Sequence, residues 1–181
     1  MTSDAHERAS DRTAEAVRYL EEKRGSHFDI VLMVQGDEPV ISPRQMSLVV
    51  EAMRENPTIQ VANLLGKISS EKEFQDPNCI KAVADLHGNA VYFSRLPIPH
   101  GAVFDDPSTG KQVCAIGFRR DFLMEYLELT PTELEVLESI DMLRILQHGG
   151  KVRLIPTSEQ TQSVDVPGDI PLAEALLQSR K

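Results

Sequence analysis

A run of five apolar residues, Ile30 to Val34, ends abruptly at the polar sequence Gln35-Gly36-Asp37-Glu38-Pro39. A short apolar run without polar interruption is typical of a strand that is buried on both faces of a sheet. Segments with helical spacing lie on both sides of this run, and further apolar runs follow along the chain. This alternation predicts an α/β fold in which helices cover both faces of a mixed, mostly parallel sheet.

The same patterns predict the individual elements. We expect helices over residues 11–24, 43–54, 121–129, 132–148 and 171–179, and strands over residues 28–34, 59–65, 80–84, 90–93, 112–118 and 152–156. Ser42-Pro43 has the form of an N-cap followed by proline in the first helical position. The sequence 85–89 reads as a hairpin turn, and Gly149-Gly150 ends the preceding helix. At 181 residues, the chain fits one domain that spans residues 1–181.

Composition excludes several classes of function. The formal net charge is −9 and no block of Lys and Arg stands out, which argues against non-specific binding to nucleic acid or to an anionic membrane. The first twelve residues are polar and carry both charge signs, unlike a signal peptide. The two cysteines, Cys79 and Cys114, are too few for a disulfide framework. We therefore expect a cytoplasmic protein without a membrane insertion.

Two acidic sites follow predicted strands. Asp37 and Glu38 stand at the end of one strand, where carboxylates can hold Mg²⁺ together with phosphate oxygens and water. The alternative is a solvated turn that Pro39 closes. Asp165 and Asp169 follow a second extended segment, where they are either a metal site or the N-cap of the last helix. The residues alone leave both alternatives open.

Cationic side chains are the next candidates for binding. They are Arg8, Arg12, Lys81, Arg95, Arg119 and Arg120. Arg95 ends an aromatic strand and precedes Leu-Pro-Ile-Pro, so its planar fork can pair with a substrate carboxylate. The same segment can instead be a stiff crossover or a dimer contact. The five histidines show no ligand spacing, and His6 is the one of most interest.

Several motifs in order resemble one family, the 3-deoxy-manno-octulosonate (Kdo) cytidylyltransferases, also called CMP-Kdo synthetases. The motifs are MTSDAHERASDRTAEAV, VLMVQGDEP, DPNCIKAVADLHGNAVYFSRLPIP, FRRDFL, LESIDMLRILQHG and VDVPGD. The resemblance covers essentially the whole chain. It implies a three-layer α/β sandwich of the nucleotide-diphospho-sugar transferase fold, a homodimer, and transfer of CMP from CTP to an acidic sugar.

The resemblance also implies roles for individual residues. Asp37 and Asp165 are expected to hold Mg²⁺ and, with Arg95, to serve catalysis. The expected nucleotide-binding residues are Arg8, Ala9, Ser10, Asp11 and Gln35, and the expected sugar-binding residues are Arg95, Gln112 and Glu138.

Three departures from the family pattern bear on these expectations. The family's first strand and phosphate-cradling loop have no counterpart, so we expect a chain that is incomplete at its N-terminus. Arg8-Ala9-Ser10 stand where the family has Ser-Gly-Thr, and Met142 stands where Gln is usual. Gln112 and Ile116 replace the family's His and Tyr of the sugar site. The sugar substrate is therefore undecided between Kdo and a related acidic sugar. One alternative is a nucleotidyltransferase of the same fold that uses a different nucleotide or a non-ulosonic sugar. The other is a catalytically inactive domain that only binds a ligand or dimerises.

Overall fold

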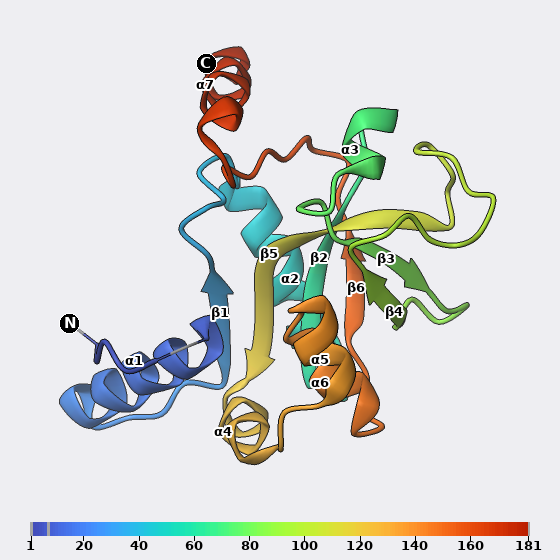
Figure 1. Cartoon of the computed structure of the whole chain (residues 1–181). Helices are drawn as coiled ribbons and strands as arrows, with labels where there is room; N and C mark the ends of the chain where they lie inside the picture. The colour runs from blue at the N-terminus through green and yellow to red at the C-terminus, as the bar shows by residue number, and fades with distance from the viewer. Residues whose placement is uncertain (1, 7, 181) are drawn as a thin grey trace.

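The computed structural model describes residues 2–6 and 8–180, so Met1 and Glu7 of the opening motif lie outside the described residues. Its centre is a sheet of six strands in which β4, β3, β5, β2 and β6 follow one another and β1 also pairs with β5 (Figure 1). The strands are β1 (Ile30–Val34), β2 (Val61–Gly66), β3 (Lys81–Ala84), β4 (Ala90–Ser94), β5 (Thr109–Arg119) and β6 (Arg153–Pro156). The helices are α1 (Ala9–Arg24), α2 (Pro43–Glu55), α3 (Glu71–Gln75), α4 (Arg120–Glu128), α5 (Glu133–Glu138), α6 (Met142–Gln147), the 3-10 turn η1 (Pro167–Asp169) and α7 (Ile170–Ser179).

The direction of the strands corrects one prediction. The sheet is mixed, as expected, but among the described strands only β2 and β6 pair in parallel. Strand β5 is antiparallel to β1, β2 and β3, and β3 is antiparallel to β4. The expectation of a mostly parallel sheet was wrong because an apolar run reports burial on both faces and carries no information on direction.

Helices cover both faces of the sheet, which gives the expected three layers. Helix α2 packs on one face, where its Val49 and Met53 meet Ala62, Leu64 and Val113 of the strands. Helices α1, α4 and α6 pack on the other face through a second apolar cluster. Successive side chains of a strand point to opposite faces, so alternate residues of β2 and β5 enter different clusters.

Helix α2 begins where the sequence predicts. The Ser42 hydroxyl accepts from the Gln45 N–H at 3.1 Å, and the Gln45 side chain accepts from the Ser42 N–H at 2.9 Å. This capping box satisfies donors that the first helical turn leaves free. No helix among the described residues is long and apolar enough to span a bilayer.

The helix expected over residues 132–148 is in fact two. Helix α5 ends at Glu138, Ser139 adopts a left-handed conformation with φ 54°, and α6 begins at Met142. The prediction was wrong because the apolar spacing continues through the break: Ile140 and Leu143 are both buried. The break presents residues 139–141 to the neighbouring cavity.

Candidate active site

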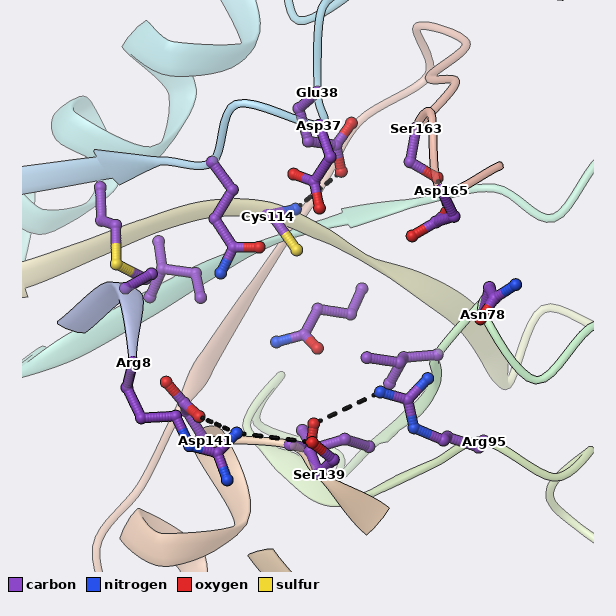
Figure 2. A pocket seen from close by; sticks show the side chains of 17 residues that line it. Arg8, Asp37, Glu38, Asn78, Arg95, Cys114, Ser139, Asp141, Ser163 and Asp165 are labelled. Atoms are coloured by element: carbon purple, nitrogen blue, oxygen red, sulfur yellow. Dashed lines mark hydrogen bonds and ion pairs between the residues drawn. The ribbon is translucent and has the colours of Figure 1, made fainter. Parts of the chain in front are cut away.

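A cavity of about 350 Å³ opens beside the sheet and collects side chains from seven separate segments of the chain. Figure 2 shows these side chains from close by. It is lined by Arg8, Ala9, Met33, Gln35, Asp37, Glu38, Asn78, Ile80, Arg95, Gln112, Cys114, Ile116, Ser139, Ile140, Asp141, Ser163 and Asp165.

The floor of the cavity follows from the two-residue period of the strands. Gln112, Cys114 and Ile116 alternate along β5 and all line the cavity, whereas Val113 and Ala115 face α2. Met33 of β1 lies opposite Ile116 in the antiparallel register. Strand β5 thus separates the apolar cluster around α2 from the cavity.

Two adjacent carboxylates form the acidic end of the cavity. Glu38 is buried; its Oε1 accepts from the Cys114 N–H at 2.9 Å, while its Oε2 is buried without a protein partner. Asp37 Oδ1 is likewise buried and unpartnered. Burial raises the pKa of Glu38, and the nearby Asp37 charge raises it further. Buried oxygens without donors are costly, so this end of the cavity favours a cationic ligand.

Asp165 approaches the same end from the C-terminal part of the chain (Figure 2). The Val164 N–H donates to the Asp37 carbonyl at 2.8 Å and so ties the two acidic segments together. Asp165 Oδ2 accepts from the Ser163 hydroxyl at 2.8 Å. Asp169 has a different task, because its Oδ2 accepts the N–H groups of Asp165 and Val166, both at 3.0 Å, and fixes the turn.

The carboxylates of Asp37 and Asp165 fit a hard divalent cation such as Mg²⁺. Oxygen ligands from one or two carboxylates, with the remaining positions left to water and phosphate, are usual for this ion. No group of three or more His, Cys, Asp and Glu side chains is placed to hold a metal among the residues that the structure describes. A cation here therefore needs further ligands from water or from a bound substrate.

Arg95 lies at the opposite end and is held by several bonds. Its Nε donates to the Glu138 carbonyl at 2.6 Å, Nη1 to the Pro77 carbonyl at 2.8 Å and Nη2 to the Ser139 carbonyl at 3.4 Å. These bonds use three of the five N–H groups of a guanidinium. The group is fixed in orientation and keeps donors for a ligand.

The break between α5 and α6 supplies the wall between Arg8 and Arg95 (Figure 2). Arg8 Nη1 lies 3.2 Å from Asp141 Oδ1, and the Ser10 hydroxyl donates to Asp141 Oδ2 at 3.3 Å. Burial raises the pKa of Asp141, and the Arg8 charge opposes that rise. Asp141 thus joins the start of α1 to the break.

Comparison with known proteins agrees with this arrangement. The family of cytidylyltransferases matches residues 1–162. The 3-deoxy-manno-octulosonate cytidylyltransferase of Geobacter sulfurreducens is 35% identical over 94% of this chain and 70% of its own length. The enzyme of that name from Syntrophus aciditrophicus is 37% identical over 99% of this chain and 72% of its own.

The chain belongs to the cytidylyltransferase family. Its fold agrees, because a CMP:2-keto-3-deoxy-manno-octonic acid synthetase solved in complex with CTP superposes with a TM-score of 0.85. That protein is 32% identical, and the match covers 100% of this chain and 72% of the other. The family places the chain in the nucleotidyltransferase class of enzymes and confirms the resemblance drawn from the motifs.

Most, but not all, of the predicted cytidylyltransferase site residues line the cavity. Asp37, Asp165, Arg95, Gln35, Gln112, Arg8 and Ala9 do so. Ser10 and Asp11 do not, because α1 begins at Ala9 and its rotation turns the next residues away. Glu138 also stays outside the lining; its carboxylate accepts from the Tyr92 hydroxyl, the Ser94 hydroxyl and the Arg95 N–H.

Four polar lining residues were not predicted as site residues: Asn78, Ser139, Asp141 and Ser163. All four lie inside a recognised motif or within three residues of a predicted site residue, and this proximity was the signal available for them. Asp141 was missed because the apolar spacing placed it within a continuous helix.

Proposed function

We propose that this chain transfers CMP from CTP to an acidic sugar, Kdo or a close relative of it, with release of pyrophosphate and with Mg²⁺ as cofactor. The observation that carries the proposal is the polarity of a single cavity. It has buried carboxylate oxygens without partners at one end, and a fixed guanidinium at the other.

The charge of the cavity supports a cation cofactor. Its lining includes four carboxylates, of Asp37, Glu38, Asp141 and Asp165, against the two guanidinium groups of Arg8 and Arg95. A nucleoside triphosphate and a sugar acid are both anions, so they enter such a cavity only if positive charge enters with them. When bound, Mg²⁺ supplies that charge and stabilises the phosphoryl oxygens as the reaction proceeds.

The chemistry divides between the two ends of the cavity. The anomeric hydroxyl of the sugar attacks the α-phosphorus of CTP and loses its proton to water. An O–P bond forms as the bond to the leaving pyrophosphate breaks. Arg95 orients the sugar carboxylate through its free N–H groups, which places the hydroxyl for an in-line approach. Asp37 and Asp165 hold the cation, and the bond from Val164 to Asp37 keeps their two segments in register.

Gln112 and Ile116 determine which polar and apolar contacts the cavity offers to the sugar. The Gln112 Nε2 donates to Asn63 Oδ1 at 2.6 Å, and buried Asn63 in turn donates to two carbonyls. This network fixes the Gln112 amide, whose oxygen remains available to a sugar hydroxyl. Ile116 offers only an apolar surface, so we expect fewer polar contacts there than the phenol of a tyrosine would make. The expected homodimer and cytoplasmic location remain predictions.

Pyrophosphate release tests the proposal. Purified chain is assayed with CTP and a panel of sugars, namely Kdo, other 2-keto acids, and their neutral alcohols, with Mg²⁺ and with excess chelator. We expect release with CTP and an acidic sugar, none with the neutral alcohols, and none in chelator. Folded protein that binds CTP by calorimetry without turnover on any sugar would instead establish the ligand-binding alternative.

A further inference from the structure

Lys81 is a fully buried lysine whose partners are all backbone carbonyls. Its Nζ donates to the carbonyls of Asp76 at 2.9 Å, Cys79 at 2.6 Å and Arg95 at 2.5 Å. These three bonds use every N–H of the ammonium group. The ammonium therefore has no donor left for a substrate, although the charge remains inside the protein.

The three carbonyls belong to two segments that meet at the cavity. Asp76 and Cys79 flank Pro77 and Asn78; Asn78 lines the cavity, and the Pro77 carbonyl accepts from Arg95 Nη1. Arg95 itself provides the third carbonyl. Arg95 is thus connected to the loop of residues 76–79 in two ways. Its carbonyl accepts from Lys81, which also binds the carbonyls of Asp76 and Cys79, and its guanidinium donates to Pro77 of that loop.

We propose that Lys81 is a positioning residue, which fixes the guanidinium of Arg95 toward the sugar by gathering these carbonyls on one ammonium. The inference rests on the proposed function, because it takes Arg95 as the contact to the sugar. Lys81 pairs with Ser94 in the register of β3 and β4, so it lies directly beside the strand end that carries Arg95.

The presence of a charged ammonium at this buried position, in place of an apolar side chain, supports a positioning role for Lys81. Desolvation penalises a buried ammonium and lowers the pKa of Lys81, with the charge of Arg95 acting in the same direction. A loop that only needed to be covered would be served by an apolar side chain at lower cost. An ammonium instead draws three carbonyl oxygens to within hydrogen-bond distance of one point, and this sets the distance between the loop and Arg95.

The test is a double-mutant cycle between Lys81→Met and Arg95→Met. Methionine keeps the length and removes the donors. We expect Lys81→Met to raise the KM for the acidic sugar by about 10- to 100-fold, with kcat and the KM for CTP within about threefold of wild type. The double variant is expected to match Arg95→Met alone within about threefold, because Lys81 acts through Arg95. Lys72→Met, an exposed lysine on α3, is the matched control and should leave all constants unchanged.

Two kinetic results would show a general structural role for Lys81 and overturn the inference. One is a double variant in which the fold-changes in KM of the two single variants multiply, and the other is a Lys81→Met variant whose KM rises equally for CTP and for the sugar.

Hydrogen exchange tests the geometry without turnover. The N–H groups of Cys79 and Arg95, which donate to Asp76 and Glu138, should exchange faster in Lys81→Met, and unchanged rates would refute the inference. If Lys81→Met does not fold, Lys81→Arg keeps the charge, and the same sugar-specific rise in KM is required of it. An inactive wild type would count against the proposed function, whereas the exchange result decides on Lys81 separately.

Discussion

The ion pair between Glu135 and Arg144 should be the main support of the break between α5 and α6. The Glu135 side chain is 1% exposed, and its oxygens accept from Arg144 Nε at 2.7 Å and Nη2 at 2.6 Å. The guanidinium also lies 4.7 Å from the centre of the Tyr126 ring. Each helix has only 6 residues, too few to be stable without such contacts.

Replacing Arg144 by methionine leaves the Glu135 carboxylate buried without its cation. Loss of one partner of a buried pair costs about 3–5 kcal/mol. For a domain of this size each kcal/mol lowers Tm by about 2–4 °C, so Arg144→Met is expected to lower Tm by about 6–20 °C. The double variant Glu135→Gln, Arg144→Met removes the uncompensated charge and should recover about 1–3 kcal/mol.

Thermal unfolding and urea titration measure these differences. The matched control is Arg44→Met, since Arg44 is 82% exposed and lies 3.8 Å from Glu159. An exposed pair is worth less than about 1 kcal/mol, so its Tm should change by less than about 4 °C. An Arg144→Met variant as stable as this control would refute the reasoning, as would a double variant less stable than the single one.

Three further predictions test other parts of the molecule. Asp37→Asn should lower kcat/KM at least about 100-fold through loss of a metal-binding charge, with Tm within about 2 °C of wild type; a large fall in Tm would favour a role in the turn only. Arg120→Met removes the largest cause that lowers the pKa of Glu21 from 4.5 to about 2. A lowered carboxyl pKa stabilises the fold above pH 4.5 and ceases to do so as pH falls toward 2. The stability difference from wild type should therefore shrink over that range in urea titrations, and a constant difference would contradict this. Ser139→Gly should be more stable than Ser139→Ala by about 1 kcal/mol, because glycine adopts the φ of 54° without strain; urea midpoints in the reverse order would contradict it.

The sequence predicted elements well where the information is local. The hairpin of β3 and β4, the N-cap at Ser42 and the apolar strand β1 were each expected within a few residues of their bounds. Side-chain period, caps and turn residues determine such features over short stretches. The direction of β5 could not be predicted in this way, because it depends on which strands of distant sequence lie beside it.

The residues of the site divide in the same way, into those that local sequence predicts and those that only the folded chain brings together. Asp37 and Asp165 were predicted because each follows an extended run and belongs to a recognised motif. Asp141 also lies in a recognised motif but was assigned to a continuous helix, so it was not predicted as a site residue. The importance of Asp141 comes from Arg8 and Ser10, more than 120 residues away in sequence, and from a break at Ser139 that apolar spacing conceals. Lys81 was identified as a cation, but its three carbonyl partners are visible only in the folded chain.

The charges of the cavity also constrain how it can bind two anions. Arg8 is paired with Asp141, and Arg95 donates three of its N–H groups to backbone carbonyls. Within the described residues, neither guanidinium is therefore wholly free to neutralise a triphosphate, while Asp37 and Glu38 each keep a buried oxygen without a donor. A ligand that carried only negative charge would meet repulsion at this end, because carboxylates there outnumber cations. The proposed need for Mg²⁺ thus follows from the placement of these charges as well as from the motif, and the chelator arm of the pyrophosphate assay tests both at once.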